Sequence, residues 1–210
     1  MKLRISFFFL LIVSLPLFGQ NKEVSFWKKY IDDDVTELKL QNLENADYHT
    51  AIRLWNPYQV VELISINDSI YHGQLVNFVT KVNRKEERKG IVSQRLTIPA
   101  TVTKTLIEQL LKEGVEELPD SYDVEGYVNG LDGTTYVFEV SSHDKYRVYS
   151  YWEPENDHYQ NPELKEVKSV RNIISAINKQ FDSWKLFTAF RDNLPAGRYQ
   201  YGGIIMVVSK

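Results

Sequence analysis

The sequence has 210 residues, of which 43% are hydrophobic and 25% are charged, a balance typical of a globular protein. Its 25 basic and 28 acidic side chains give a net charge of −3, which argues against nucleic-acid binding because such proteins need a basic surface. The absence of Cys excludes disulfides, thiol nucleophiles, iron–sulfur clusters and Cys-ligated zinc.

The first nineteen residues have the pattern of a secretory signal peptide. Lys2 and Arg4 form a positive start, an apolar run covers 7–13, and the small residue Gly19 follows. We expect cleavage after Gly19, so that the mature chain begins at Gln20. A membrane anchor is the alternative, but the apolar run is shorter than the roughly 20 residues that span a bilayer. The pattern therefore predicts a periplasmic or secreted protein without membrane insertion.

Residues 20–210 contain no internal repeat and no low-complexity linker, which favours a single domain. A short first helix is expected over 24–31, where Val24, Trp27, Tyr30 and Ile31 have helical spacing. Three acids follow at 32–34. Adjacent carboxylates do not converge on one point in a helix or a strand, so we interpret them as a solvated charge run.

Four strands are expected between residues 48 and 98, at 51–55, 59–66, 70–82 and 91–98. Turn signals separate them: Asn56-Pro57, residues 67–69 and the charged loop 83–90. Gly73 interrupts the third strand. Strands joined by short turns predict an antiparallel meander.

The rest of the chain alternates helices with strands. Pro99 should open a helix that ends near Glu113 and is capped by Gly114. A hairpin is expected from the strands 134–140 and 146–152. Asn161 and Pro162 should start a second long helix, which runs to about residue 180. Its apolar positions recur at spacings of three and four: Leu164, Val167, Val170, Ile174, Ile177 and Phe181.

Helical spacing continues briefly through Phe190, and residues 199–208 read as one last strand, with a bulge or a close backbone approach at Gly202-Gly203. Grouped strands with helices between the groups predict the α+β class. We expect one mostly antiparallel sheet, a meander plus a hairpin, with the two longer helices packed on one face.

No enzyme motif is present. The sequence has no Gly-x-Ser-x-Gly elbow, no phosphate-binding Gly-rich loop and no His-Glu-x-x-His. No two of its histidines have metal-ligand spacing along one helix: His49, His72, His143 and His158. We therefore expect neither a metal site nor a cofactor.

The densest group of polar and aromatic side chains lies within residues 149–163. Aromatic rings beside acids suit a sugar or peptide groove, where flat rings stack and carboxylates accept hydrogen bonds. A calcium loop starting at residue 153 fails, because it would need Gly and Glu where His158 and Leu164 stand. The predicted ligand-binding residues are Tyr149, Tyr151, Trp152, Glu153, Glu155, Asp157, His158 and Tyr159.

Three interpretations of this segment stay open. In the first, it belongs to a non-enzymatic binding module for an envelope protein or a glycan, which is the function we favour. In the second, carboxylates or His from residues 143–163 serve a cell-envelope hydrolase. In the third, Tyr149 and Tyr151 only pack on a sheet face, and the acids lie in a solvated loop before a helix.

Two stretches carry a resemblance to other proteins. The Leu-Phe-Gly-Gln-Asn stretch at 17–21 resembles the signal-peptide ends of exported proteins of the Bacteroidota. The stretch DGTTYVFEVSSHDKYRVYSYWEP, residues 132–154, is similar to one that recurs in uncharacterised exported proteins of that group. The resemblance implies a hairpin before a helix and no activity. LPAGRY at 194–199 is similar to a turn in the sorting domains of type IX secretion, and we interpret it as a turn before the last strand.

Overall fold

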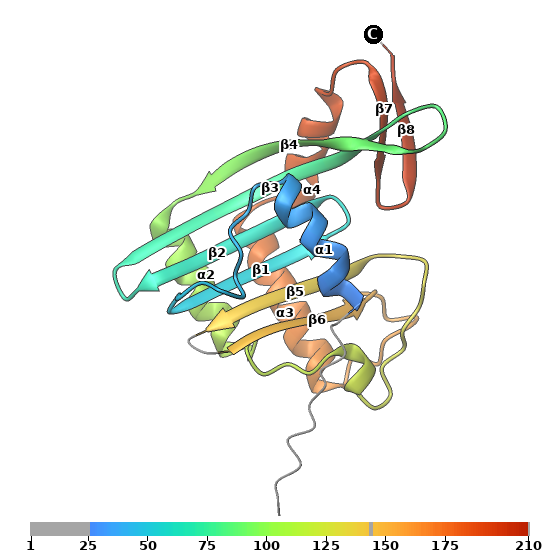
Figure 1. Ribbon diagram of the computed structural model, residues 1–210. Coiled ribbons are helices and arrows are strands. Elements are labelled where there is room, and N and C mark those ends of the chain that lie inside the picture. The colour runs from blue at the N-terminus through green and yellow to red at the C-terminus, as the bar shows by residue number, and fades with distance from the viewer. Residues whose placement is uncertain (1–25, 143–144, 210) are drawn as a thin grey trace, which may run out of the picture.

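The computed structural model describes residues 26–142 and 145–209, and within them eight strands form one antiparallel sheet (Figure 1). Four α-helices accompany the sheet, so the α+β class and the mostly antiparallel sheet are confirmed. The predicted signal peptide, its cleavage point at Gln20, and His143 lie outside the described residues.

The centre of the sheet is the predicted meander. Its strands follow one another in space as they do in the chain, and each pairs with the next: β1 (Thr50–Asn56), β2 (Gln59–Asn67), β3 (Ile70–Val82) and β4 (Arg88–Ile98). A hairpin of β5 (Thr135–Ser142) and β6 (Lys145–Trp152) extends the sheet beside β1. Most strand boundaries agree with the expected ones to within one residue because turn residues mark them, but β4 starts at Arg88, inside the predicted loop 83–90, and β5 ends two residues later than expected.

A second hairpin, β7 (Gly197–Tyr201) and β8 (Ile204–Val208), joins the far end of β3 at Thr80 and Lys81. The prediction of one last strand over 199–208 is therefore wrong. Gly202 and Gly203 both have positive φ, 51° and 79°, and they form a two-residue turn rather than a bulge. Gly-Gly between two apolar runs is a hairpin signal, because both central residues of such a turn need positive φ.

The helices lie on both sides of the sheet (Figure 1). Helix α1 (Phe26–Glu37) crosses one face, whereas α4 (Ser183–Asp192) and the longer α2 (Ala100–Lys112) and α3 (Lys165–Gln180) lie behind the strands in that view. Segment 113–134, which contains the short 3₁₀ helix η1 (Ser121–Asp123), connects α2 to β5.

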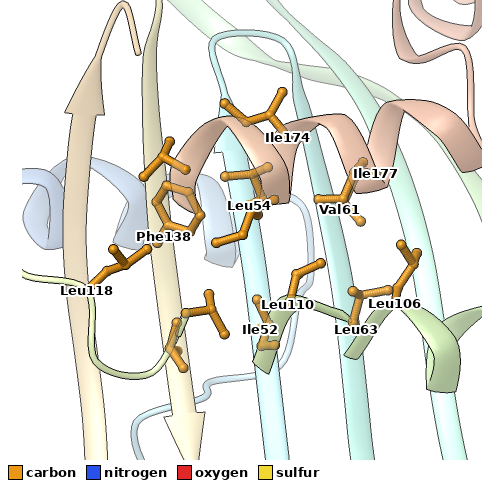
Figure 2. Close-up of a cluster of buried hydrophobic side chains, with 14 of the residues drawn as sticks. Ile52, Leu54, Val61, Leu63, Leu106, Leu110, Leu118, Phe138, Ile174 and Ile177 are labelled. Carbon is orange, nitrogen blue, oxygen red and sulfur yellow. The ribbon is translucent and has the colours of Figure 1, made fainter. Parts of the chain in front are cut away.

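The largest apolar cluster joins α2 and α3 to the sheet (Figure 2). Figure 2 shows Ile174 and Ile177 of α3 above Leu54 and Val61 of the strands. The predicted apolar positions Val167, Val170, Ile174 and Ile177 are buried, and Ile173 is buried with them. These buried positions stabilise the fold, because each buried Leu, Ile or Val side chain contributes about 1.5–3 kcal/mol.

Two helices differ from the expected boundaries. α3 begins at Lys165, not at Asn161, because the Asn161 side chain accepts from the Glu163 N–H at 2.9 Å and forms a separate turn. α1 continues through residues 32–34, and Asp34 is buried there rather than solvated. Its carboxylate is paired with Arg88 at 2.7 Å, a contact that spacing along the chain could not reveal.

Gly73 has a packing role in β3. A Cβ at this position would lie 2.2 Å from Thr103 Oγ1 of α2 and 2.9 Å from Ile98 Cβ. Helix α2 therefore approaches the strand at a point where a side chain would not fit.

Candidate functional site

A groove of about 1400 Å³ lies on the α1 face of the sheet. Its lining comes from α1, from the turn between β1 and β2, from residues 120–133 and from the turn between β7 and β8. These segments are far apart in the sequence. The groove is larger than the roughly 300–1,000 Å³ of small-molecule pockets and is large enough for an extended ligand.

The floor of the groove is apolar. Trp55, Phe78 and Val137 line it, and all three are buried in a cluster with Ile31 of α1. The rings of Trp55 and Phe78 meet edge to face with centroids 6.3 Å apart. This contact contributes to the packing of the floor, since aromatic pairs favour such edge-to-face geometries.

A buried ionic cluster lies beside the floor. Arg53, with no exposed surface, donates to Glu62 through Nε at 2.6 Å and to Glu139 through Nη1 at 3.0 Å. Glu139 also accepts from the Trp55 indole N–H at 3.3 Å and from the Tyr146 hydroxyl at 3.0 Å. Burial, with the nearby Glu139 carboxylate, raises the pKa of Tyr146 far above its usual value, so the phenol remains a donor. Tyr146 also lines the groove, which links the ionic cluster to it.

One ion pair with the sheet and one with the loop before β1 hold α1 near its two ends. Near its end, Arg88 of β4 contacts Asp34 at 2.7 Å and Glu37 at 3.0 Å. Near its start, Lys28 pairs with Glu44 at 3.0 Å and lies 5.6 Å from the centre of the Tyr146 ring. Burial raises the pKa of Asp34, and the Arg88 guanidinium opposes that rise without cancelling it.

The rim carries large apolar side chains that face solvent. Phe26 and Tyr30 of α1 are 74% and 62% exposed, and Tyr122 is 74% exposed on the 120–133 side. Leu131 on the same side is fully exposed. Such side chains gathered around one concavity mark an interaction surface, whereas single exposed apolar residues carry no such meaning.

Two carboxylates accompany the rings on this rim. Asp120 accepts from the Tyr122 N–H at 3.1 Å and from the Ser150 N–H at 3.0 Å, and burial raises its pKa. Asp123 is exposed and lines the groove. The rim therefore combines flat rings with hydrogen-bond acceptors.

The sequence predicts a different set of binding residues, on β6 and in the turn that follows it. Tyr149 and Tyr151 are buried, with 1% and 0% of their surface exposed, and they face the α2 and α3 side. Their hydroxyls donate to the carbonyl oxygens of Val115 at 2.5 Å and Pro119 at 2.7 Å. The Tyr149 ring stacks on Phe138 at 4.9 Å. Both rings are thus packed on that side of the strand, although Tyr149 also lines the groove.

Trp152 and the segment after it form a turn that is held to α3. The buried Trp152 indole donates to the Asp132 carbonyl at 2.7 Å, and Tyr159 packs on its ring at 4.7 Å. Arg171 of α3 reaches back to the turn, donating to the Pro154 carbonyl at 2.7 Å and pairing with Asp157 at 2.7 Å.

The remaining acids of this turn also have partners. Glu153 Oε1 accepts from the Thr134 N–H at 2.5 Å, and Glu155 accepts from the Tyr136 hydroxyl at 3.0 Å. His158 stacks edge to face on Tyr159 at 5.1 Å. The predicted residues are therefore divided between the core and an exposed turn, and Tyr149 is the one among them that lines the groove.

Within the described ranges, no cluster of three or more His, Asp or Glu side chains could hold a metal ion. In the same part of the chain, no helix is long and apolar enough to cross a membrane.

The rim residues were missed for a physical reason. Tyr30 has helical spacing with Trp27, so a one-dimensional pattern assigns both to the core. Tyr122 and Leu131 lie in a segment without periodicity. No local signal in the sequence marks them, because residues 120–133 are no richer in hydrophobic residues than the chain as a whole.

Comparison with known proteins adds no family assignment, since no protein family and no curated protein matches this chain.

Proposed function

We propose that this protein is a non-enzymatic binding module that holds a glycan in the groove on the α1 face. The observation that carries the proposal is the rim, where exposed rings of α1 and of the 120–133 segment stand beside carboxylates. Flat rings stack on the apolar faces of sugar rings, and carboxylates accept hydrogen bonds from sugar hydroxyls. The groove volume suits several linked sugars rather than one.

In this proposal the two faces of the sheet have different roles. We take the two longer helices, α2 and α3, to be packed on one face as a structural layer, since both contribute to the largest apolar cluster. The α1 face is then the one available to a ligand. With the predicted signal peptide, the ligand would be a glycan outside the cytoplasm, in the cell envelope or beyond it.

The hydrolase alternative has less support. A glycoside hydrolase needs two carboxyl groups placed on either side of one bond. In the 153–159 turn, Glu155 is bonded to Tyr136 and Asp157 is paired with Arg171, and neither lines the groove. An envelope protein as the partner remains the competing outcome of the experiment below.

The test is a glycan-array screen of the purified mature chain, followed by titration of the best glycan. Tyr30→Ala and Tyr122→Ala should each weaken binding by about 30-fold, because truncation of a hot-spot Tyr costs about 2 kcal/mol. Tyr159→Ala is the matched control, since Tyr159 is exposed on the turn after β6 and not in the groove.

Melting temperatures of all three variants should stay close to that of the wild type. A glycan that binds the rim variants unchanged, or an array with no binder while an envelope protein is captured through the same rim, would overturn the glycan proposal. Release of reducing ends from the bound glycan would support the hydrolase instead.

A further inference from the structure

The β8 strand forms an end of the sheet. It pairs with β7, and no other strand of the described chain pairs with it. Its five residues, Ile204–Val208, are all apolar, and Ile204 and Val207 are 55% and 60% exposed. An uncharged edge without proline or a bulge is a template for pairing with another strand.

The other edges of the sheet are protected. The strand at one edge is β4, which carries Arg88, Lys89 and Arg95, and such charges discourage strand addition. Along β6, the preceding segment 113–134 occupies the edge. Its Asp120 carboxylate accepts from the Ser150 N–H at 3.0 Å, and its Leu118 carbonyl accepts from Arg147 at 2.6 Å. The β8 edge has neither device.

The turn fixes which backbone groups of β8 point outward. In a two-residue hairpin the closing pair, here Tyr201 and Ile204, is hydrogen-bonded, and pairs alternate from there. Ile204, Met206 and Val208 therefore direct their backbone groups toward β7. Ile205 and Val207 direct theirs away, and no hydrogen bond within the described ranges reaches them.

This alternation of inward and outward backbone groups allows β8 to pair with a second copy of itself. Ile205 and Val207 lie one residue on either side of Met206, so a second antiparallel β8 centred on Met206 places Ile205 opposite Val207 of the second copy. Both outward residues then exchange their N–H and C=O groups with the facing strand. Because residues 204–208 carry no charge, this pairing puts no like charges opposite each other.

We propose that two copies of this protein associate through β8, antiparallel and centred on Met206, to form one continuous sheet. The association is isologous, with the same five residues on both sides. A strand edge of this length buries less than the roughly 1,000 Å² of a stable interface, so the dimer is reversible and concentration-dependent. It does not depend on the proposed groove or its ligand.

A cysteine scan tests the register, since the natural sequence has no Cys. Met206→Cys brings the two sulfurs together at a non-hydrogen-bonded position, where facing Cα atoms are about 4.5 Å apart, within disulfide range. Ile204→Cys, the matched control, faces Val208 of the second copy and should cross-link at least tenfold more slowly. Equal cross-linking of both variants, or none with Met206→Cys, overturns the proposal.

A second variant tests the hydrogen bonds. Ile205→Pro removes only an outward N–H, so the β7–β8 hairpin keeps its own ladder. Sedimentation velocity over micromolar to millimolar concentrations should show a dimer for the wild type and for Ile205→Val, and a monomer for Ile205→Pro with an unchanged melting temperature. A wild type that stays monomeric throughout, or an Ile205→Pro variant that dimerises like Ile205→Val, refutes it.

Discussion

The two faces of the sheet differ in the kind of side chain that they bury. The α2 and α3 side contains the large apolar cluster, in which Leu54, Val61 and Ile174 interdigitate (Figure 2). The α1 side holds all the buried charged residues of the described chain: Asp34, Arg53, Glu62 and Glu139. Burying charge costs free energy unless every group is paired, whereas apolar burial stabilises without such a condition.

Under the proposed function, that difference separates binding from stability in this molecule. A ligand groove needs polar groups and open space, both of which weaken a core. Here the apolar cluster on the opposite face provides the stability, and the α1 face keeps a groove over a floor fixed by Trp55 and by the ions around Arg53.

The largest expected effect comes from removing the charge on Arg53. Arg53→Met leaves the buried Glu62 and Glu139 carboxylates without their cation, which should cost about 3–5 kcal/mol of unfolding free energy in urea.

The matched control is the triple variant Arg53→Met, Glu62→Gln and Glu139→Gln, which should recover most of that loss because no charge remains in this cluster. A single Arg53→Met variant that loses less than about 1 kcal/mol would show that the cluster is open to water, contrary to the burial seen here.

On the opposite face, Ile174→Ala should cost about 2–5 kcal/mol, the range for deleting a buried Ile side chain. Lys168→Ala on the same helix should cost under about 0.5 kcal/mol, because Lys168 is exposed and only pairs with Glu163. Equal shifts in denaturant midpoint for the two variants would mean that the buried side of α3 is misassigned.

The sequence predicted this face well because its signals are local. The spacing of Val167, Val170, Ile174 and Ile177 reports burial directly, and turn residues mark the ends of the strands. Where two local signals competed, the prediction failed: Gly202-Gly203 suits a bulge or a turn, and Asn161 can cap a turn as well as a helix.

The α1 face could not be predicted in the same way. Arg53, Glu62 and Glu139 come together only because β1 pairs with both β2 and β5, with Arg53 in register with each Glu. The same limit applied on the α2 and α3 side to Tyr149 and Tyr151, which share one face of β6 by alternation but are buried there, with their hydroxyls bonded to the 113–134 segment. Alternation shows that two side chains share a face, not whether that face is covered.

A substitution at the close contact between α2 and β3 should have an intermediate effect on stability. Gly73→Ala should cost about 1–3 kcal/mol, because the new methyl group meets Thr103 Oγ1 and Ile98 Cβ in a well-packed layer. Thr80→Val in the groove is the control and should change the unfolding free energy by less than about 0.5 kcal/mol. Adding Thr103→Ala should restore part of the loss, and a Gly73→Ala variant as stable as the wild type would refute the close approach.

The smallest expected effect tests how α1 is held. Burial raises the pKa of Asp34 despite Arg88, so the folded state binds this proton more tightly than the unfolded state. The stability that Asp34 contributes is therefore present below its ordinary carboxyl pKa and declines as the pH rises through the raised folded value. The Asp34→Asn variant cannot ionise at this position. Its unfolding free energy should therefore increase relative to that of the wild type as the pH rises from about 3 to 7. Asp33→Asn, on the exposed side of the same helix, corrects for the general effect of removing a negative charge. If the unfolding free energy of Asp34→Asn instead decreases relative to that of the wild type as the pH rises, the ion pair with Arg88 outweighs burial. In that case α1 is held over the groove mainly by charge.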